Sequence, residues 1–106
     1  MNSKPIRIIG EALAEHERQY DNLFDHSVVK AERYRTEILK GLLAISARPN
    51  GYGYVSGHTF RSYGPTRKEK YRIGYIETND QIVVLAIYYS GSRDPLYWVG
   101  RAFEGV

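Results

Sequence analysis

Apolar residues recur at helical spacing through the first half of the chain. From Glu11 to Phe24 they gather on one side while charged residues fill the remainder, a pattern that predicts an amphipathic helix. A second apolar stripe, with steps of three and four residues, predicts a longer helix that Pro49 ends. Its members are Ala31, Tyr34, Ile38, Leu42 and Ile45, and Leu39 and Leu43 widen it. Because only the polar break 25–27 separates the two helices, we expect an antiparallel hairpin, with Asp25 or Ser27 capping the second helix.

Strands are predicted at the start of the chain and in its second half. Segments 58–63 and 71–77 alternate with period two, 5–9 is a short β-branched run, and 81–89 is a continuous apolar run. The last of them is apolar on both faces, which is typical of a central strand. A loop rich in glycine and tyrosine at 51–57 separates the second helix from the later strands. A basic loop at 64–70 separates the strand predicted at 58–63 from the one at 71–77.

These elements predict an α+β fold in a single domain that spans residues 1–106. An N-terminal strand is followed by the antiparallel two-helix hairpin, which packs on one face of a small, mainly antiparallel sheet. The length of 106 residues leaves little room for a second core. We therefore expect the other face of the sheet to be free for function.

Composition narrows the class of protein. Cysteine is absent, which excludes a disulfide-stapled secreted scaffold and a thiolate metal site. The start of the chain, 1–10, has only a short apolar run that Arg7 interrupts, too little for a signal-peptide core, and no stretch approaches membrane-spanning length. We therefore expect a cytoplasmic protein with no membrane segment. The three histidines are scattered, so neither a metal ion nor another cofactor is expected.

Positive charge is concentrated between residues 61 and 72. Against the single acid Glu69, this segment carries five basic residues: Arg61, Arg67, Lys68, Lys70 and Arg72. Because side chains alternate along a strand, Arg72 is expected to point away from Tyr71 and Ile73. A basic segment of this kind suits binding to phosphates or to an acidic protein surface. The plainer alternative is a solvated turn.

Several parts of the sequence resemble the RelE/ParE superfamily of toxins from type II toxin–antitoxin systems. They are the N-terminal strand with its helical hairpin, Lys70-Tyr71-Arg72-Ile73-Gly74-Tyr75, and the apolar run 82–89 followed by Ser92-Arg93-Asp94-Pro95-Leu96-Tyr97-Trp98. The resemblance covers most of the chain and is least in the loop 51–57. The Arg-Asp-Pro ending is most similar to the ParE branch. Where relatives often have a histidine after the last strand, this chain has Tyr88-Tyr89-Ser90.

The resemblance implies roles for particular residues. In the ribonuclease branch, arginines that match Arg72 and Arg93 hold the scissile phosphate, a role suited to a guanidinium group that keeps its charge. Proton transfer would then fall to Tyr97 or His58, with Lys68 or Lys70 lowering the negative charge. The structural alternatives are a solvated strand face for Arg72, an ion pair with the adjacent Asp94 for Arg93, and core packing for the aromatic residues near the end of the chain: Tyr88, Tyr89, Tyr97 and Trp98.

Three functions remain open at this stage. The favoured one is a ParE-like toxin of a plasmid-stabilisation module that inhibits growth by binding an essential target, with DNA gyrase as the expected target, and that a cognate antitoxin neutralises. It is favoured because the sequence offers no convincing acid and base pair, so we lean against an enzyme. The alternative is a RelE-like, ribosome-dependent mRNA endoribonuclease, whose substrate the ribosome would orient. The second alternative is a non-toxic binding module on the same fold.

Overall fold

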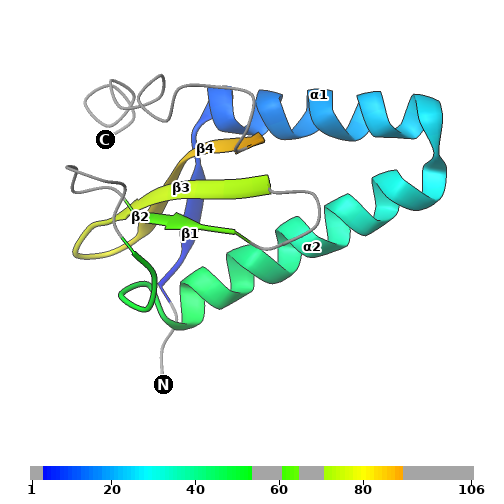
Figure 1. Ribbon diagram of the computed structural model, residues 1–106. Helices are drawn as coiled ribbons and strands as arrows, with labels where there is room; N and C mark the ends of the chain where they lie inside the picture. The colour runs from blue at the N-terminus through cyan, green and yellow to red at the C-terminus, as the bar shows by residue number, and fades with distance from the viewer. Residues whose placement is uncertain (1–3, 54–60, 65–70, 90–106) are drawn as a thin grey trace.

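The computed structural model describes residues 4–53, 61–64 and 71–89 of the chain. Within these ranges the fold is α+β, with two helices and four strands (Figure 1). In chain order the elements are β1 (Ile6–Ile8), α1 (Gly10–His26), α2 (Val28–Ala47), β2 (Arg61–Tyr63), β3 (Tyr71–Glu77) and β4 (Ile82–Tyr89). The predicted order of strand, two helices and three strands is confirmed.

The four strands form one sheet in the order β1-β4-β3-β2. The meander β2-β3-β4 is antiparallel, as predicted, but β1 pairs with β4 in the parallel direction. The sheet is therefore mixed, and the prediction of a mainly antiparallel sheet is matched only in part. The long connection explains the difference, because a strand joined through two helices is not forced into the antiparallel direction that a tight turn imposes.

One irregularity in β4 decides which side chains face the helices. The register of β3 with β4 shifts between Gly74 and Tyr75, which leaves Leu85 as an extra residue in β4. Leu85 and Ala86 consequently both belong to the cluster on the face away from the helices. Ile87 returns to the cluster on the helix side. The bulge thus turns Ile87, in place of Ala86, toward the helices.

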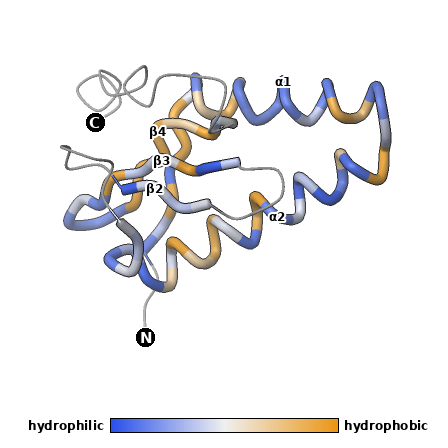
Figure 2. Tube along the Cα trace, in the orientation of Figure 1, coloured by the Kyte–Doolittle hydropathy of each residue, from blue (hydrophilic) through white to orange (hydrophobic). Residues whose placement is uncertain are grey.

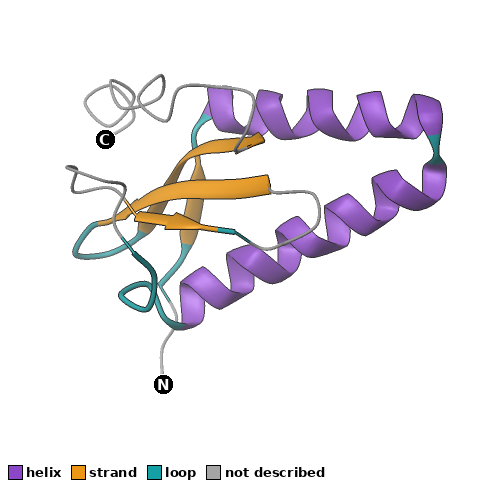
Figure 3. Ribbon diagram, viewed as in Figure 1, coloured by secondary structure: helices purple, strands orange, loops and turns teal. Residues whose placement is uncertain are grey.

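The helices form the predicted hairpin, whose tip lies away from the sheet (Figure 3). Ser27 lies between them and caps α2, because its hydroxyl accepts a hydrogen bond from the Lys30 backbone N–H at 3.3 Å. Asp25 and His26, which the sequence assigned to the break, belong to the last turn of α1. Neither α1 nor α2 combines the length and apolar character needed to cross a lipid bilayer.

The apolar stripe of α2 is narrower than the sequence suggested. Its buried residues are Ala31, Tyr34, Ile38, Gly41 and Ile45, whereas Leu42, which the sequence placed in the stripe, is only partly buried against the core. Leu39 and Leu43 were expected to widen the stripe, but they are 52% and 70% exposed. Each follows a stripe residue by one position, about 100° further round the helix, so it turns away from the sheet. Figure 2 shows the contrast between apolar β4 and the largely hydrophilic α1.

Both faces of the sheet are apolar along β4. On the helix side, Ile82 and Val84 pack with residues of both helices. On the other face, Val83, Leu85 and Ala86 are fully buried. The expectation that this second face is free for function is therefore wrong along the middle of β4.

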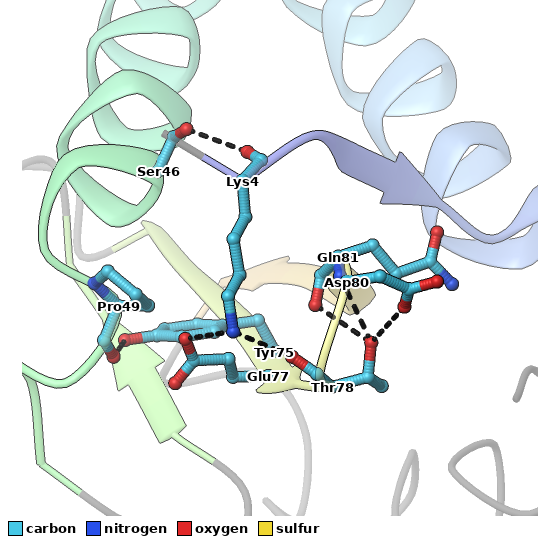
Figure 4. A network of polar contacts seen from close by, with 8 residues as sticks. All are labelled: Lys4, Ser46, Pro49, Tyr75, Glu77, Thr78, Asp80 and Gln81. Carbon is cyan, nitrogen blue, oxygen red and sulfur yellow. Dashed lines mark hydrogen bonds and ion pairs between the residues drawn. The ribbon is translucent and has the colours of Figure 1, made fainter. Parts of the chain in front are cut away.

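A polar network joins the start of the chain to the end of α2 and to the turn between β3 and β4 (Figure 4). The Lys4 ammonium lies 2.7 Å from a carboxylate oxygen of Glu77 and donates a hydrogen bond to the Thr78 carbonyl at 2.8 Å. The Lys4 carbonyl accepts a hydrogen bond from the Ser46 hydroxyl at 3.0 Å. These contacts fix the entry of β1, which has only three residues to hold it in the sheet.

Replacing Lys4 by methionine should therefore lower the free energy of unfolding. The change keeps the apolar stem and removes one ion pair and one hydrogen bond, a loss of about 1 kcal/mol. Urea unfolding followed by circular dichroism measures it. Lys40→Met, at an exposed position of α2, is the matched control and should leave the midpoint unchanged. Equal midpoints for Lys4→Met and the wild type would contradict the structural role of Lys4.

Candidate target-binding site

Two of the basic residues proposed for binding lie in the described part of the chain, namely Arg61 and Arg72. The remaining candidates lie outside the described residues, and their roles stay predictions: His58, Arg67, Lys68, Lys70, Arg93 and Tyr97. The geometry of the site is therefore built from Arg72 and its neighbours.

Arg72 lies on β3, on the face away from the helices, as the strand alternation predicted. Its Nε donates a hydrogen bond to the Ser62 hydroxyl at 2.7 Å, and its Nη2 donates to the Ser62 carbonyl at 3.2 Å. The side chain is half-buried. One edge of the guanidinium group is thus bound to a single residue of the neighbouring strand β2.

The pairing of the strands explains why Ser62 can accept both bonds. In an antiparallel pair, the N–H and C=O of one residue point to the same side of the strand. The Ser62 N–H donates to the Gly53 carbonyl at 3.1 Å, so the Ser62 carbonyl also points to the side away from β3. Arg72 therefore reaches across β2 to bind the Ser62 carbonyl on the outer side of this strand.

Tyr88 completes the polar group on this face. It is the register partner of Arg72, is 8% exposed, and brings its hydroxyl to 3.2 Å from the Ser62 hydroxyl. Register partners lie on the same face, with Cβ atoms about 4.5–5.5 Å apart. Arg72, Ser62 and Tyr88 thus form a linked cluster at the end of an otherwise apolar surface, and we call it the arginine cluster.

Ser62 was not among the residues predicted from the sequence to form the site. The signal that would have found it is the strand register, because Ser62 pairs with Gly74, two residues along β3 from Arg72. Residues two apart on one strand share a face. Nothing in the sequence alone fixes that register, since the 58–63 segment is short.

Arg61 and Arg72 do not share one surface. Arg61 pairs with Tyr75, so it lies on the helix side of the sheet. Its Nη1 donates a hydrogen bond to the Tyr52 carbonyl, in the loop after α2. Burial raises the pKa of the Tyr75 hydroxyl to about 12, and the nearby charge of Arg61 opposes that rise. Both arginines were expected to bind one target, and that target would have to contact both faces of the sheet.

The charge of Arg72 has no acidic partner among the described residues. Ion pairs between described residues include Lys4–Glu77 and Arg35–Glu32, and neither involves Arg72. A half-buried guanidinium group bound only to neutral oxygens keeps its full attraction for an anion. The chemical capacity of the cluster is therefore to bind an oxyanion, such as a phosphate or a carboxylate.

The described histidines do not supply an acid or base to this cluster. His16 lies on α1, its Nδ1 3.0 Å from the Tyr34 hydroxyl, and the two rings stack on the helix side of the sheet. It lines a groove of about 390 Å³ together with Leu13, Glu17, Tyr20, Asp21 and Arg35. No group of three possible metal-binding side chains occurs in the described ranges.

Burial lowers the pKa of His16 below 6.5; the charge of Arg35 adds to this effect, and that of Glu17 opposes it. The unfolded chain therefore takes up a proton first as the pH falls. The stability that neutral His16 provides should be fully present above about pH 6.5 and be lost as the pH drops toward the lowered pKa. Urea midpoints measured from pH 8 to pH 5 should decrease for the wild type.

His16→Gln removes the titrating group while keeping an acceptor for Tyr34, so its midpoints should vary less with pH. His26→Gln, at an exposed position near the end of α1, serves as the control and should follow the wild type. Parallel curves for His16→Gln and the wild type would show that His16 does not govern this dependence.

The comparisons with known proteins add no family to this description. No protein-family model matches the chain, and no curated protein matches it either. The resemblance to RelE/ParE toxins therefore rests on the residues quoted from the sequence. What the chain does has to be argued from the arginine cluster and its surroundings.

Proposed function

We propose that this protein is the toxin of a type II toxin–antitoxin pair and acts in the cytoplasm by binding an essential target, with DNA gyrase as the expected one. The observation that carries the proposal is the guanidinium group of Arg72, held by Ser62 and left without an acidic partner among the described residues. The α+β arrangement supports it, because this order of elements is the one that the resemblance to RelE/ParE toxins implies.

Binding is favoured over RNA cleavage by the groups around Arg72. Cleavage through the ribose 2′-hydroxyl needs a base to activate it and an acid for the leaving oxygen. The neighbours described here are the hydroxyls of Ser62 and Tyr88, and His16 lies on the opposite side of the sheet. A positioned cation beside neutral hydroxyls suits recognition of an anion without chemistry. The RelE-like ribonuclease, with His58 or Tyr97 in proton transfer, is kept as an outcome of the test.

An antitoxin partner accords with the apolar surface of the helical hairpin. Six large apolar side chains are 42–70% exposed there: Leu13, Phe24, Val28, Val29, Leu39 and Leu43. A disordered antitoxin tail gains enough to fold only when it covers apolar area of this kind. We propose that the tail lies along the hairpin and continues toward the basic segment 61–72.

Inducing the protein in bacteria without its antitoxin should stop growth. Under the favoured proposal, mRNA stays intact and gyrase-linked DNA breaks accumulate. Arg72→Ala should remove the arrest, because the anion of the target loses its partner. Arg33→Ala, at an exposed position of α2, is the matched control and should arrest growth as the wild type does.

Other outcomes separate the alternatives. Codon-phased cuts in mRNA would replace the gyrase proposal with the ribonuclease, and unaltered growth at full expression of folded protein would point to the non-toxic binding module. Arg72→Ala also removes two hydrogen bonds, at a cost of about 1–3 kcal/mol. Thermal unfolding of the purified variant must therefore show that it is folded at the growth temperature.

A further inference from the structure

We propose that Ser62 is the positioning residue of the arginine cluster. It binds one edge of the Arg72 guanidinium group and thereby aims the other edge at an anionic group of the target. This inference rests on the proposed function, because it assigns a role in target binding to a residue that does not itself carry charge. Its physical basis lies in the hydrogen bonds of Arg72, in the fixation of Ser62, and in the space above Gly64.

The hydrogen bonds of Arg72 use one side of the guanidinium plane. Nε–H and the neighbouring N–H of Nη2 point in nearly the same direction, and the hydroxyl and carbonyl of Ser62 accept them. Arginine has five N–H donors in a rigid fork. The remaining donors, on Nη1 and on the far side of Nη2, have no partner among the described residues. They form a second edge that fits two oxygens of one phosphate or carboxylate.

Ser62 is itself held in place, so it can restrain the arginine. Its backbone N–H donates to the Gly53 carbonyl at 3.1 Å, and its hydroxyl lies 3.2 Å from that of Tyr88. A free arginine side chain samples many rotamers and loses that freedom when a ligand orders it. Restraint by Ser62 removes most of this cost before the target arrives, which strengthens binding without any added contact.

Gly64 provides the space that this orientation requires. A Cβ atom built on Gly64 would lie 2.8 Å from Nη1 of Arg72 and 3.5 Å from its Cζ. The backbone of Gly64 does not have the positive φ that only glycine adopts easily, so alanine fits the chain there. Gly64→Ala should therefore move the guanidinium group, which is the end of a flexible side chain, while leaving the fold intact.

Two measurements on the full chain test the role of Ser62. The first is the rate of hydrogen exchange of the Arg72 Nε–H, followed by ¹⁵N NMR. The second is the inducer dose needed for growth arrest. Ser62→Ala should speed the exchange about tenfold or more and raise the dose by a similar factor, because about 1.4 kcal/mol of preorganisation corresponds to a factor of ten. Ser62→Thr keeps the hydroxyl and should restore both values to within about twofold of the wild type.

Matched controls separate positioning from folding. Thr36→Ala removes an exposed hydroxyl from α2 and should change neither measurement. Gly64→Ala should raise the dose while thermal unfolding shows that the purified variant is still folded at the growth temperature. If Ser62→Ala does not fold, Gly64→Ala and Ser62→Thr still decide the question, since a merely structural role for Ser62 predicts a normal dose for Gly64→Ala.

Unchanged exchange and an unchanged dose in Ser62→Ala would overturn the proposal. Failure of the proposed function gives a different result, because the wild type then causes no arrest at any dose. The hydrogen-exchange rate of the Arg72 Nε–H remains informative in that case. Slow exchange in the wild type and fast exchange in Ser62→Ala would uphold the positioning of Arg72, and equal rates would refute it.

Discussion

The burial of β4 on both faces is the constraint on which the structure depends. Its residues from Ile82 to Ala86 are fully buried, and each face must therefore be covered by other apolar groups. The helical hairpin covers one face, and Ile9 and Ile76 contribute to the cover of the other. The extra residue at Leu85 reverses the faces that the later side chains of β4 take. β1 and β3 pair with β4 on its two sides.

The arginine cluster lies where this apolar cover ends. A charged group is costly to bury without hydrogen-bond acceptors, and Ser62 supplies two for Arg72 from the edge strand β2. The same bonds protect the backbone of that edge and orient the guanidinium group. Packing of the edge strand and presentation of a cation are thus linked through one serine.

Much of the fold could be predicted from the sequence, because periodicity reports directly on secondary structure. The helices and the segment 71–77 were found from their spacing alone, and Arg72 was placed on the correct face. Periodicity does not report on partners between strands. The parallel direction of β1, the shift at Leu85 and the exposure of Leu43 all depend on tertiary pairing. Ser62 was missed for the same reason, because its role exists only in the register of β2 with β3.

The pairing of β1 with β4 also determines when the molecule can become complete during synthesis. Ile6 is the register partner of Ile82, 76 positions later in the chain (82 − 6 = 76). The hairpin forms from neighbouring residues, whereas β1 cannot take its place in the sheet until β4 has been synthesised. A nascent or truncated chain that lacks β4 has neither the central strand nor Tyr88. A chain can therefore assemble the arginine cluster only once it includes β4, and fragments that end before β4 lack it.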